Sequence, residues 1–392
     1  MTKRSIAFLA ATLASVPAWA VYAPIPEEEL GQSLTVRVGG GVYHDNNIFG
    51  GATGETESMV YRFSPSLKFN ASLTAQTFFS AAYDLNWDHV VDRPENQDLY
   101  NHRLSARLAH AFSQRSTFDF TNTYTIAENP ESLLAGVPLN TDQSFKNNQA
   151  DLVFKSGINE RLGYTFKARS SIYAFDIATL SEQLDRSESL FGLSLDYSVS
   201  EASQLLGELR YLDVSYDSLG NTKDKHSYYY LAGFDYAPSE KVSISVRAGF
   251  EERYRSGAPD DDSPYAEITG RYAYGEKSFV SAGYIRTTEE NSNVNLYTDI
   301  EVNRFFLTLQ HAFTAQVTGS VFYNIEPSTL NGRAGIAPDA DETTQRGGLA
   351  LSYQPRRHWL VAATLDIDST DSDDNNRDLD RTRIGLDVRY TF

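Results

Sequence analysis

Apolar and polar side chains alternate along most of this chain, and the alternation is clearest over residues 383–392. A period of two is typical of a β-strand with one apolar and one polar face. The apolar positions of this stretch are Ile384, Leu386, Val388, Tyr390 and Phe392. Similar alternating stretches of about a dozen residues recur from Ser33 onward. The pattern therefore predicts a protein built almost entirely of strands.

Polar connectors separate these stretches, and short connectors alternate with long ones. The short connectors have the composition of tight turns and centre on 70–73, 113–115, 159–161, 200–202, 238–240, 275–277, 314–316 and 354–357. The long connectors are rich in Asp, Asn, Gly and Pro and cover 45–56, 90–97, 129–141, 178–184, 217–224, 256–263, 290–295, 326–342 and 370–377. This alternation is typical of outer-membrane barrels, which have short periplasmic turns and long extracellular loops.

The spacing of the connectors predicts about 18 antiparallel strands, an even number as in bacterial single-chain barrels. We therefore expect an all-β fold, a transmembrane up-and-down β-barrel with both chain ends on the side of the short turns. The alternative is a soluble β-sandwich, but its Greek-key crossings would not sort the connectors by length. Two strands switch apolar parity, near 304–306 and 211–212, and a β-bulge there would re-aim their faces.

The N-terminus has the pattern of a secretory signal peptide. Lys3 and Arg4 precede a short apolar run, and a small-x-small site follows at 18–20. The apolar run is too short to span a membrane. We expect three parts: a signal peptide (1–20), a periplasmic leader (21–32) and the outer-membrane barrel (33–392).

Composition narrows the class of protein. No later segment has ~18 consecutive apolar residues, which argues against a transmembrane helix. The mean hydropathy of −0.41 still permits a barrel, because only every second residue of a strand faces lipid. The net charge of −18 argues against a nucleic-acid partner, whose phosphates require a basic surface. The chain has no cysteine, so it contains neither disulfides nor thiolate chemistry.

Aromatic residues are frequent, with 24 Tyr and 22 Phe. Many lie within a few positions of a short connector, where the aromatic girdle at one membrane interface is expected. These residues are Phe112, Tyr197, Tyr236, Tyr274, Phe279, Phe313, Tyr353, Trp359, Tyr390 and Phe392.

In a barrel the polar face of each strand lines the lumen. The alternation assigns these charged residues to the lumen: Arg62, Lys68, Arg103, Arg107, Lys167, Arg169, Arg247, Glu251, Asp366, Asp368, Arg383, Asp387 and Arg389. Two interpretations stay open. The charges brace the wall by pairing across strands, or the basic excess forms a ladder that favours anionic solutes or anionic sugars.

The last strand carries a second expectation. Its apolar set, Ile384, Leu386, Val388, Tyr390 and Phe392, ends on an aromatic residue. This ending resembles the C-terminal strand of bacterial outer-membrane barrels, which the barrel-assembly machinery is thought to read. We therefore expect this set to act as an assembly signal, and we expect outer-membrane lipid and lipopolysaccharide to surround the barrel.

The acidic excess lies mainly in the long connectors, as in 260–262, 339–342 and 371–374. Solvated surface charge explains such runs. A second interpretation is recruitment of divalent cations at the lipopolysaccharide surface. The spacing of Asp366, Asp368, Asp371 and Asp373 resembles a calcium loop, but it lacks the glycine and the terminal glutamate of an EF-hand. We therefore predict no metal site.

Catalytic motifs are absent from the sequence. None of the seven histidines lies in a nucleophile-elbow or zinc-protease motif. The glycine-rich spots at 39–41, 50–51 and 347–348 do not precede predicted helices, so they do not indicate a phosphate-binding loop. We predict no enzyme activity and no cofactor, and we keep an outer-membrane hydrolase only as a distant alternative.

Two early motifs resemble a family of outer-membrane β-barrel porins. The first strand ends in Tyr43-His44-Asp45-Asn46-Asn47-Ile48-Phe49, and 61–67 has the aromatic-x-x-Pro-x-Leu pattern of that family's second strand. Members often accompany genes for exopolysaccharide synthesis and export. The resemblance covers about thirty residues in motif and implies an outer-membrane channel, with service to a secreted polysaccharide as its narrower implication. It carries over no site residues.

These observations lead to one main hypothesis and one alternative. The main hypothesis is a porin-like channel that passes polar or sugar-like solutes, with exopolysaccharide export as its narrower form. The alternative is a non-conducting barrel that docks partners of a secretion or envelope system.

Overall fold

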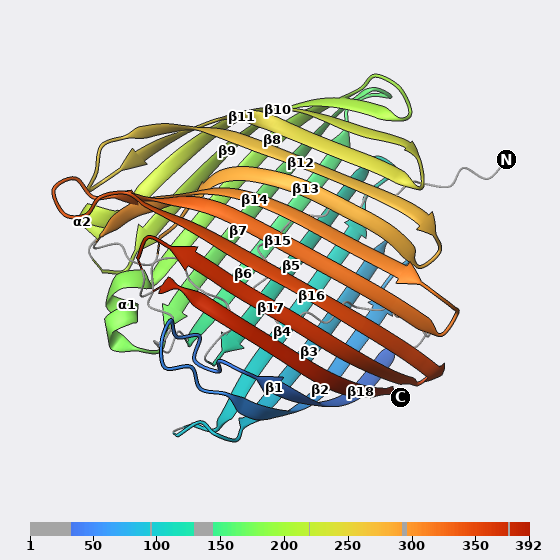
Figure 1. Ribbon diagram of the computed structural model, residues 1–392. Coiled ribbons are helices and arrows are strands. Elements are labelled where there is room, and N and C mark those ends of the chain that lie inside the picture. Colours follow the sequence, from blue (N-terminus) through green and yellow to red (C-terminus); the bar gives the residue numbers. More distant parts are fainter. Residues whose placement is uncertain (1–32, 95, 129–143, 219, 292–295, 375–376) are drawn as a thin grey trace.

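The computed structural model describes residues 33–94, 96–128, 144–218, 220–291, 296–374 and 377–392. Within these residues the chain forms one 18-stranded antiparallel sheet. Each strand pairs with the strands before and after it, and β1 pairs with β18, so the sheet closes into a barrel (Figure 1). The predicted fold and strand number are confirmed. The signal peptide and leader expected at 1–32 lie outside the described residues.

The strands are β1 (Leu34–Asp45), β2 (Ser58–Ser72), β3 (Thr77–Val90), β4 (Asp98–Ala111), β5 (Ser116–Ala127), β6 (Phe145–Gly157), β7 (Leu162–Phe175), β8 (Arg186–Ser198), β9 (Ser203–Tyr216), β10 (Lys225–Ser239), β11 (Val242–Arg255), β12 (Asp261–Gly275), β13 (Ser278–Glu289), β14 (Tyr297–Ala312), β15 (Val317–Gly332), β16 (Ala340–Arg356), β17 (Trp359–Ser372) and β18 (Leu379–Thr391). Two short helices lie in connections, α1 (Ala178–Leu184) and α2 (Gly220–Lys223). Neither helix is long and apolar enough to cross a membrane.

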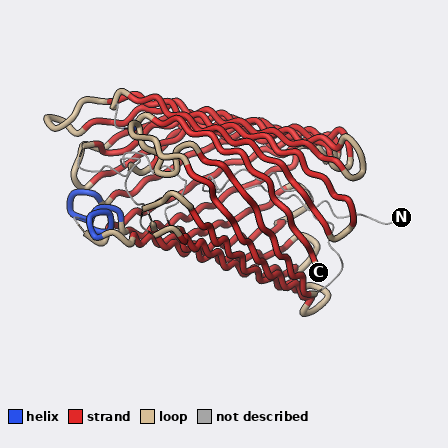
Figure 2. Tube along the Cα trace, turned by 60° about the horizontal axis from the view of Figure 1, so that its bottom comes forward, coloured by secondary structure: helices blue, strands red, loops and turns tan. Residues whose placement is uncertain are grey.

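The short and long connections lie at opposite ends of the barrel, as the sequence predicts. Figure 2 shows α1 at the long-loop end and the C-terminus at the other. Three short turns are capped by a side chain at their first or second position: Ser113, Asn159 and Thr314 each accept two backbone N–H groups. Such local bonds favour a turn over a continued strand.

Some predicted boundaries were wrong. The first short turn lies at 73–76, after the expected 70–73, and the loop expected at 326–342 shrinks to 333–339 because β15 and β16 extend. The loops expected at 178–184 and 217–224 contain α1 and α2. The loop expected at 129–141 lies outside the described residues.

The outer face of the barrel is apolar. Leu104, Leu209 and Leu386 are more than half exposed, although they lie in the interior of regular strands. In water such a surface would be unfavourable, whereas a bilayer solvates it. Aromatic rings meet near both rims. Phe112 contacts His110 and Phe154 near the short turns, and Trp87 stacks on Tyr100 near the long loops.

The interpretation of Phe279 as a girdle residue was wrong. Phe279 pairs with the buried Gln310 on the inward face, and the guanidinium of Arg271 lies 3.8 Å from its ring centroid. The Phe279 ring therefore makes a cation–π contact inside the barrel and does not face lipid.

The parity switches have a different cause from the expected bulges. The ladders of β9 run without a register shift, and the shift in β14 falls between Tyr297 and Ile300, before the expected place. Val214 and Val302 are nearly inaccessible and face inward. Apolar residues on the inner face, not reversed faces, therefore disturb the alternation.

Three buried apolar clusters lie inside the long-loop end of the barrel. The first joins α1, through Leu180 and Leu184, to the ends of β5, β6 and β7. The second is built from β14, β15 and β16 around Val302 and Leu330. The third is built from β1, β2 and β3 together with Ile48 of the first loop. The interior is therefore packed at the long-loop end.

Candidate functional site

Contacts between strands that are not neighbours identify the inner face of the barrel. The Nζ of Lys225 on β10 lies 2.8 Å from Oε2 of Glu290, which follows β13. Arg255 on β11 forms an ion pair with Asp299 on β14. Side chains on a convex surface diverge, so only the concave side brings such groups together. With strand alternation, these anchors place every second residue of each strand in the lumen.

The structure places the charged residues that sequence alternation assigned to the lumen on this inner face, and many are paired. Three pairs are bidentate: Arg62 with Asp88 at 2.6 and 2.7 Å, Arg247 with Asp235 at 2.7 and 2.9 Å, and Arg107 with Asp119. The other pairs are Lys167 with Glu208 at 3.4 Å, Arg169 with Asp151 at 2.6 Å, Glu251 with Arg253 at 2.7 Å, and Arg383 with Asp368 at 3.2 Å.

The remaining lumen candidates differ in their surroundings. Asp387 accepts a hydrogen bond from Tyr43, and Asp366 is buried opposite Arg383 in the ladder. Arg389 is half-buried near the C-terminus. Within the described residues, Lys68 and Arg103 have no ion-pair partner, although Arg103 pairs in register with Asp84. Bracing thus accounts for most of the charges but not for Lys68 and Arg103.

The middle of the lumen is accessible to water. Arg169 and Asp151 lie near the centres of β7 and β6, and their side chains are 32% and 30% exposed. The neighbouring Lys167 is 33% exposed. Because these side chains point into a closed barrel, their exposure requires open space inside it. An ion pair in this setting is screened by water and contributes about 0–1 kcal/mol to stability.

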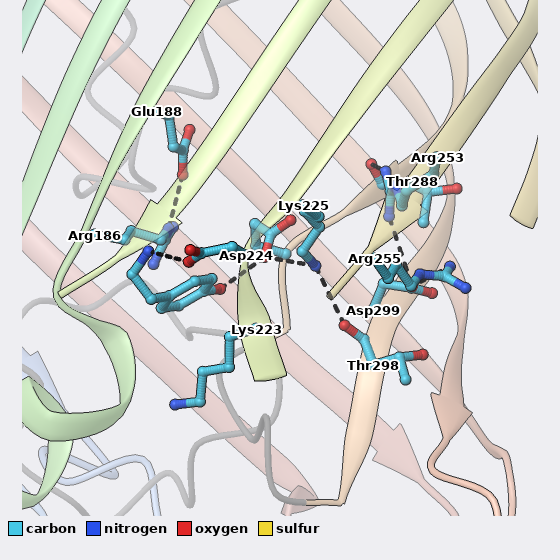
Figure 3. Close-up of polar contacts among 12 residues, drawn as sticks. Arg186, Glu188, Lys223, Asp224, Lys225, Arg253, Arg255, Thr288, Thr298 and Asp299 are labelled. Carbon is cyan, nitrogen blue, oxygen red and sulfur yellow. Dashed lines mark hydrogen bonds and ion pairs between the residues drawn. The ribbon is translucent and has the colours of Figure 1, made fainter. Parts of the chain in front are cut away.

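The long-loop end of the lumen contains a buried ionic network instead (Figure 3). Arg186 donates to Glu188 at 2.8 Å, and the Tyr216 hydroxyl donates to Glu290 at 2.7 Å. Lys225 also contacts Glu290, so the contacts of Glu290 join β9 and β10 to the end of β13.

A second part of the network centres on Asp299, which is fully buried. Arg255 pairs with it directly, and Nη1 of Arg253 lies 3.7 Å from its Oδ2. Arg253 also donates to the carbonyl of Thr288 at 2.9 Å. Buried charges are costly unless paired and hydrogen-bonded, so this network fixes the packing of the loop-end interior.

Sequence reasoning missed Lys225, Arg253, Asp299 and Tyr43. For Asp299 the local signal is the disturbed alternation, since the β14 register shifts between Tyr297 and Ile300. For Tyr43 the signal is glycine, since a Cβ at Gly41 or Gly385 would collide with its ring.

Two groups in the long connections have shifted pKa values. Burial lowers the pKa of Lys223 to about 8, and the charge of Arg333 adds to this shift. The Lys223 ammonium donates to the carbonyl of Gln183 at 2.8 Å. Burial alone would raise the pKa of Glu290, but Lys225, Arg253 and Arg186 outweigh it and hold this pKa below its usual value. Glu290 is therefore ionised at neutral pH.

The histidines contact mainly aromatic and polar groups of the outer face. His110 Nδ1 and the Thr77 hydroxyl share a hydrogen bond of 2.9 Å. His311 contacts Tyr274, and His226 stacks on Tyr254. No group of three or more His, Asp or Glu side chains that could hold a metal ion occurs in the described part of the chain. Of the calcium-like aspartates, Asp368 pairs with Arg383 and Asp373 accepts the backbone N–H of Asp341.

Comparison with known proteins finds no matching family model and no similar curated sequence. Among solved structures the chain resembles OpdK of Pseudomonas aeruginosa with vanillate, at 11% identity and a TM-score of 0.48 over 92% of this chain and 99% of that one. It also resembles OccAB4 of Acinetobacter baumannii, at 10% identity and a TM-score of 0.47 over 92% of this chain and 98% of that one. A third similar structure is OpdQ of P. aeruginosa, at 12% identity and a TM-score of 0.48 over 92% of this chain and 97% of that one. These similarities are too low to assign a family.

Proposed function

We propose that this protein is an outer-membrane channel that passes polar solutes by diffusion through the lumen. The observation that carries the proposal is the water-exposed pair Arg169 and Asp151 in the middle of a closed barrel. The apolar outer face, bounded by aromatic rings near both rims, supports a location in a bilayer. The signal-like N-terminus supports export to the outer membrane, where lipopolysaccharide and the barrel-assembly machinery are its expected partners.

The lining determines which solutes suit this channel. Arginines, carboxylates and hydroxyl groups offer hydrogen bonds along the wall, so hydrated or sugar-like molecules exchange water for protein contacts at little cost. The packed network and apolar clusters occupy part of the lumen at the long-loop end. Selectivity is expected to depend on charged lumen residues that water reaches, such as Arg169 and Lys167.

Exopolysaccharide export is the narrower form of the proposal. The motifs at 43–49 and 61–67 support it, because they resemble porins that accompany polysaccharide genes. A polar lumen that water reaches at Arg169 and Asp151 is compatible with an extended sugar chain.

Single-channel recording in planar bilayers tests the proposal. The purified full-length barrel should give discrete conductance steps, and Arg169→Gln should change their ion selectivity while leaving the fold intact. Tyr61→Phe, on the outer face of β2, is the matched control and should leave the conductance unchanged. Absence of conductance in correctly folded protein would overturn the channel.

The buried loop-end network favours a second candidate, a non-conducting barrel that docks envelope partners. If this candidate holds, wild-type protein should be silent in bilayers and should copurify with a periplasmic partner. Weakening the network with Asp299→Asn should then open a measurable current.

A further inference from the structure

Two aromatic side chains face the lumen on the adjacent strands β14 and β15 (Figure 1). Their chain neighbours Phe305 and Tyr323 are 47% and 40% exposed on the lipid-facing side, so the alternation turns Phe306 and Phe322 inward. Both inward rings are partly exposed. Because the barrel is closed, this exposure opens onto the lumen. The two rings lie between the centres of their strands and the short-turn rim, away from the packed long-loop end.

The ladder register places two hydrogen-bonding side chains beside these rings. Phe306 pairs with Asn324, and Thr308 pairs with Phe322. Rings and polar groups thus occupy alternate corners of a four-residue patch, which we call the lumen tetrad. Directly paired residues have Cβ atoms about 5 Å apart, and residues two apart along a strand are separated by about 7 Å. The patch is therefore comparable in size to one pyranose ring.

A glycine lies beside each ring. A Cβ at Gly283 on β13 would collide with the Phe306 ring, and a Cβ at Gly348 on β16 would collide with the Phe322 ring. Each ring therefore reaches over the neighbouring strand and lies along the wall. The glycines give the rings this room, and each ring keeps an accessible surface toward the lumen.

The two polar members of the tetrad have hydrogen-bonding capacity to spare. Among the residues that the structure describes, neither the Thr308 hydroxyl nor the Asn324 amide makes a side-chain hydrogen bond with the protein, and both residues are partly exposed. A hydroxyl and an amide each offer both a donor and an acceptor. Water or a ligand in the lumen therefore supplies their partners.

Charged groups border the tetrad but do not belong to it. Arg304, the next inward residue of β14 toward the long loops, forms ion pairs with both Glu326 and Glu289. On β16 the tetrad is bordered by Arg346, and the ladder places Asp368 directly beside that arginine. The four tetrad residues themselves are neutral. The patch thus offers stacking surfaces and neutral hydrogen bonds, which suit an uncharged ligand better than an ion.

We propose that the lumen tetrad is a binding site for a neutral sugar chain, which stacks its pyranose rings on Phe306 and Phe322. This proposal rests on the channel function proposed above and names its substrate class. The C–H groups on the face of a pyranose ring are attracted to the negative face of an aromatic ring, and the contact removes apolar surface from water. The sugar hydroxyls exchange hydrogen bonds with Thr308 and Asn324. Ligand sites generally combine apolar surface with a few placed polar groups in this way.

Block of the single-channel current by cellohexaose tests the tetrad. Cellohexaose is a neutral chain of pyranose rings, and a polyethylene glycol of similar length is the control for simple obstruction of the pore. The variant F306L/F322L keeps apolar side chains beside both glycines but removes the aromatic faces. Its block by cellohexaose should need an about tenfold higher concentration than that of wild type, a difference of ~1.4 kcal/mol, while block by the glycol should not change. An unchanged block by cellohexaose would overturn the site.

Two further ring variants separate sugar stacking from packing of the wall. F306Y/F322Y keeps both aromatic faces and should retain the block by cellohexaose. F279L is the matched control, because Phe279 is another inward ring of this wall but lies close to the short-turn rim and outside the tetrad. It should also be blocked like wild type. If F279L weakens the block as much as F306L/F322L does, the tetrad is not the site.

A variant of the polar corners tests the class of ligand. T308V/N324L leaves both rings in place but removes the hydroxyl and the amide. Its block by cellohexaose should weaken about tenfold, because several neutral hydrogen bonds are lost. If this variant binds cellohexaose like wild type, the rings serve an apolar ligand, and the assignment to sugar is overturned.

A binding measurement separates failure of the tetrad from failure of the channel. Cellohexaose is titrated by calorimetry against the detergent-solubilised full-length barrel and against F306L/F322L, and the heat-dependent mobility shift verifies that both are folded. Binding that F306L/F322L loses, in a barrel without conductance, supports the tetrad and overturns the channel. Conductance with no ring-dependent binding supports the channel and overturns the tetrad.

Discussion

Tyr43 of β1 donates its hydroxyl to Asp387 of β18, across the seam where the barrel closes. Its ring occupies the space that the missing side chains of Gly41 and Gly385 leave open. Arg381 and Asp45 pair across the same seam nearer the long loops, at 3.0 Å. The first and last strands are thus joined by side chains as well as by the backbone ladder.

Removing the Tyr43 hydroxyl should weaken this closure. In Tyr43→Phe the half-buried carboxylate of Asp387 loses its donor, which should cost about 1–3 kcal/mol. Urea unfolding in detergent, followed by the heat-dependent mobility shift of the folded barrel, measures the loss. Tyr61→Phe on the outer face is the control and should unfold like wild type, and equal stability of both variants would contradict the prediction.

The buried network should respond more strongly than the water-exposed pairs. Asp299→Ala leaves Arg253 and Arg255 buried without their shared carboxylate, which should cost about 3–5 kcal/mol. The matched variant Asp119→Ala removes the partner of Arg107, whose side chain is 45% exposed, and should cost about 1 kcal/mol or less. Proteolysis of the long loops and urea unfolding report the difference. Similar losses in both variants would show that the network is not desolvated.

Local patterns determine most of the fold. Sequence alternation correctly assigns Arg62 and Arg169 to the inner face of the barrel, because side chains along a strand alternate with a strict period of two. The turns at Ser113, Asn159 and Thr314 carry their own capping groups. Strand number and connector lengths follow from these local signals, and none of them depends on distant residues.

The parts that sequence reasoning missed depend on the closed barrel. Lys225 and Glu290 meet only because the curvature brings β10 near the end of β13. Val302 is apolar and faces inward, because it packs in a buried cluster at the loop end. A rule that every inward residue is polar would wrongly assign Val302 to the lipid-facing side. The same rule placed Phe279 outside, although Arg271 covers it inside. Such contacts require the register and shear of the whole sheet.

Lys223 should lose its proton at a lower pH than an exposed lysine. Its pKa of about 8 lies below the value for an unfolded chain, so the loop gains stability as pH rises from about 8 toward 10.5. Below that window the charged form is present in both states and the full penalty of burial applies. The pH profile of reductive methylation, read by mass spectrometry with exposed Lys241 as reference, measures the midpoint. Arg333→Gln should raise it, and an unchanged midpoint would contradict the role of Arg333.

Phe392 should matter for assembly more than for the stability of the finished barrel. Its backbone N–H donates to the carbonyl of Val36 at 2.9 Å, while its ring is 57% exposed and touches mainly Tyr390. An exposed ring contributes little to folding, so Phe392→Ala should retain the unfolding midpoint of wild type. If the last strand is a recognition signal, the same variant should slow insertion by the barrel-assembly machinery in proteoliposomes.

Phe313→Ala is the matched control, because Phe313 is 62% exposed near the same rim but belongs to an internal turn. Equal insertion rates for the two variants would remove the signal role, whereas a lowered midpoint for Phe392→Ala alone would make the residue structural.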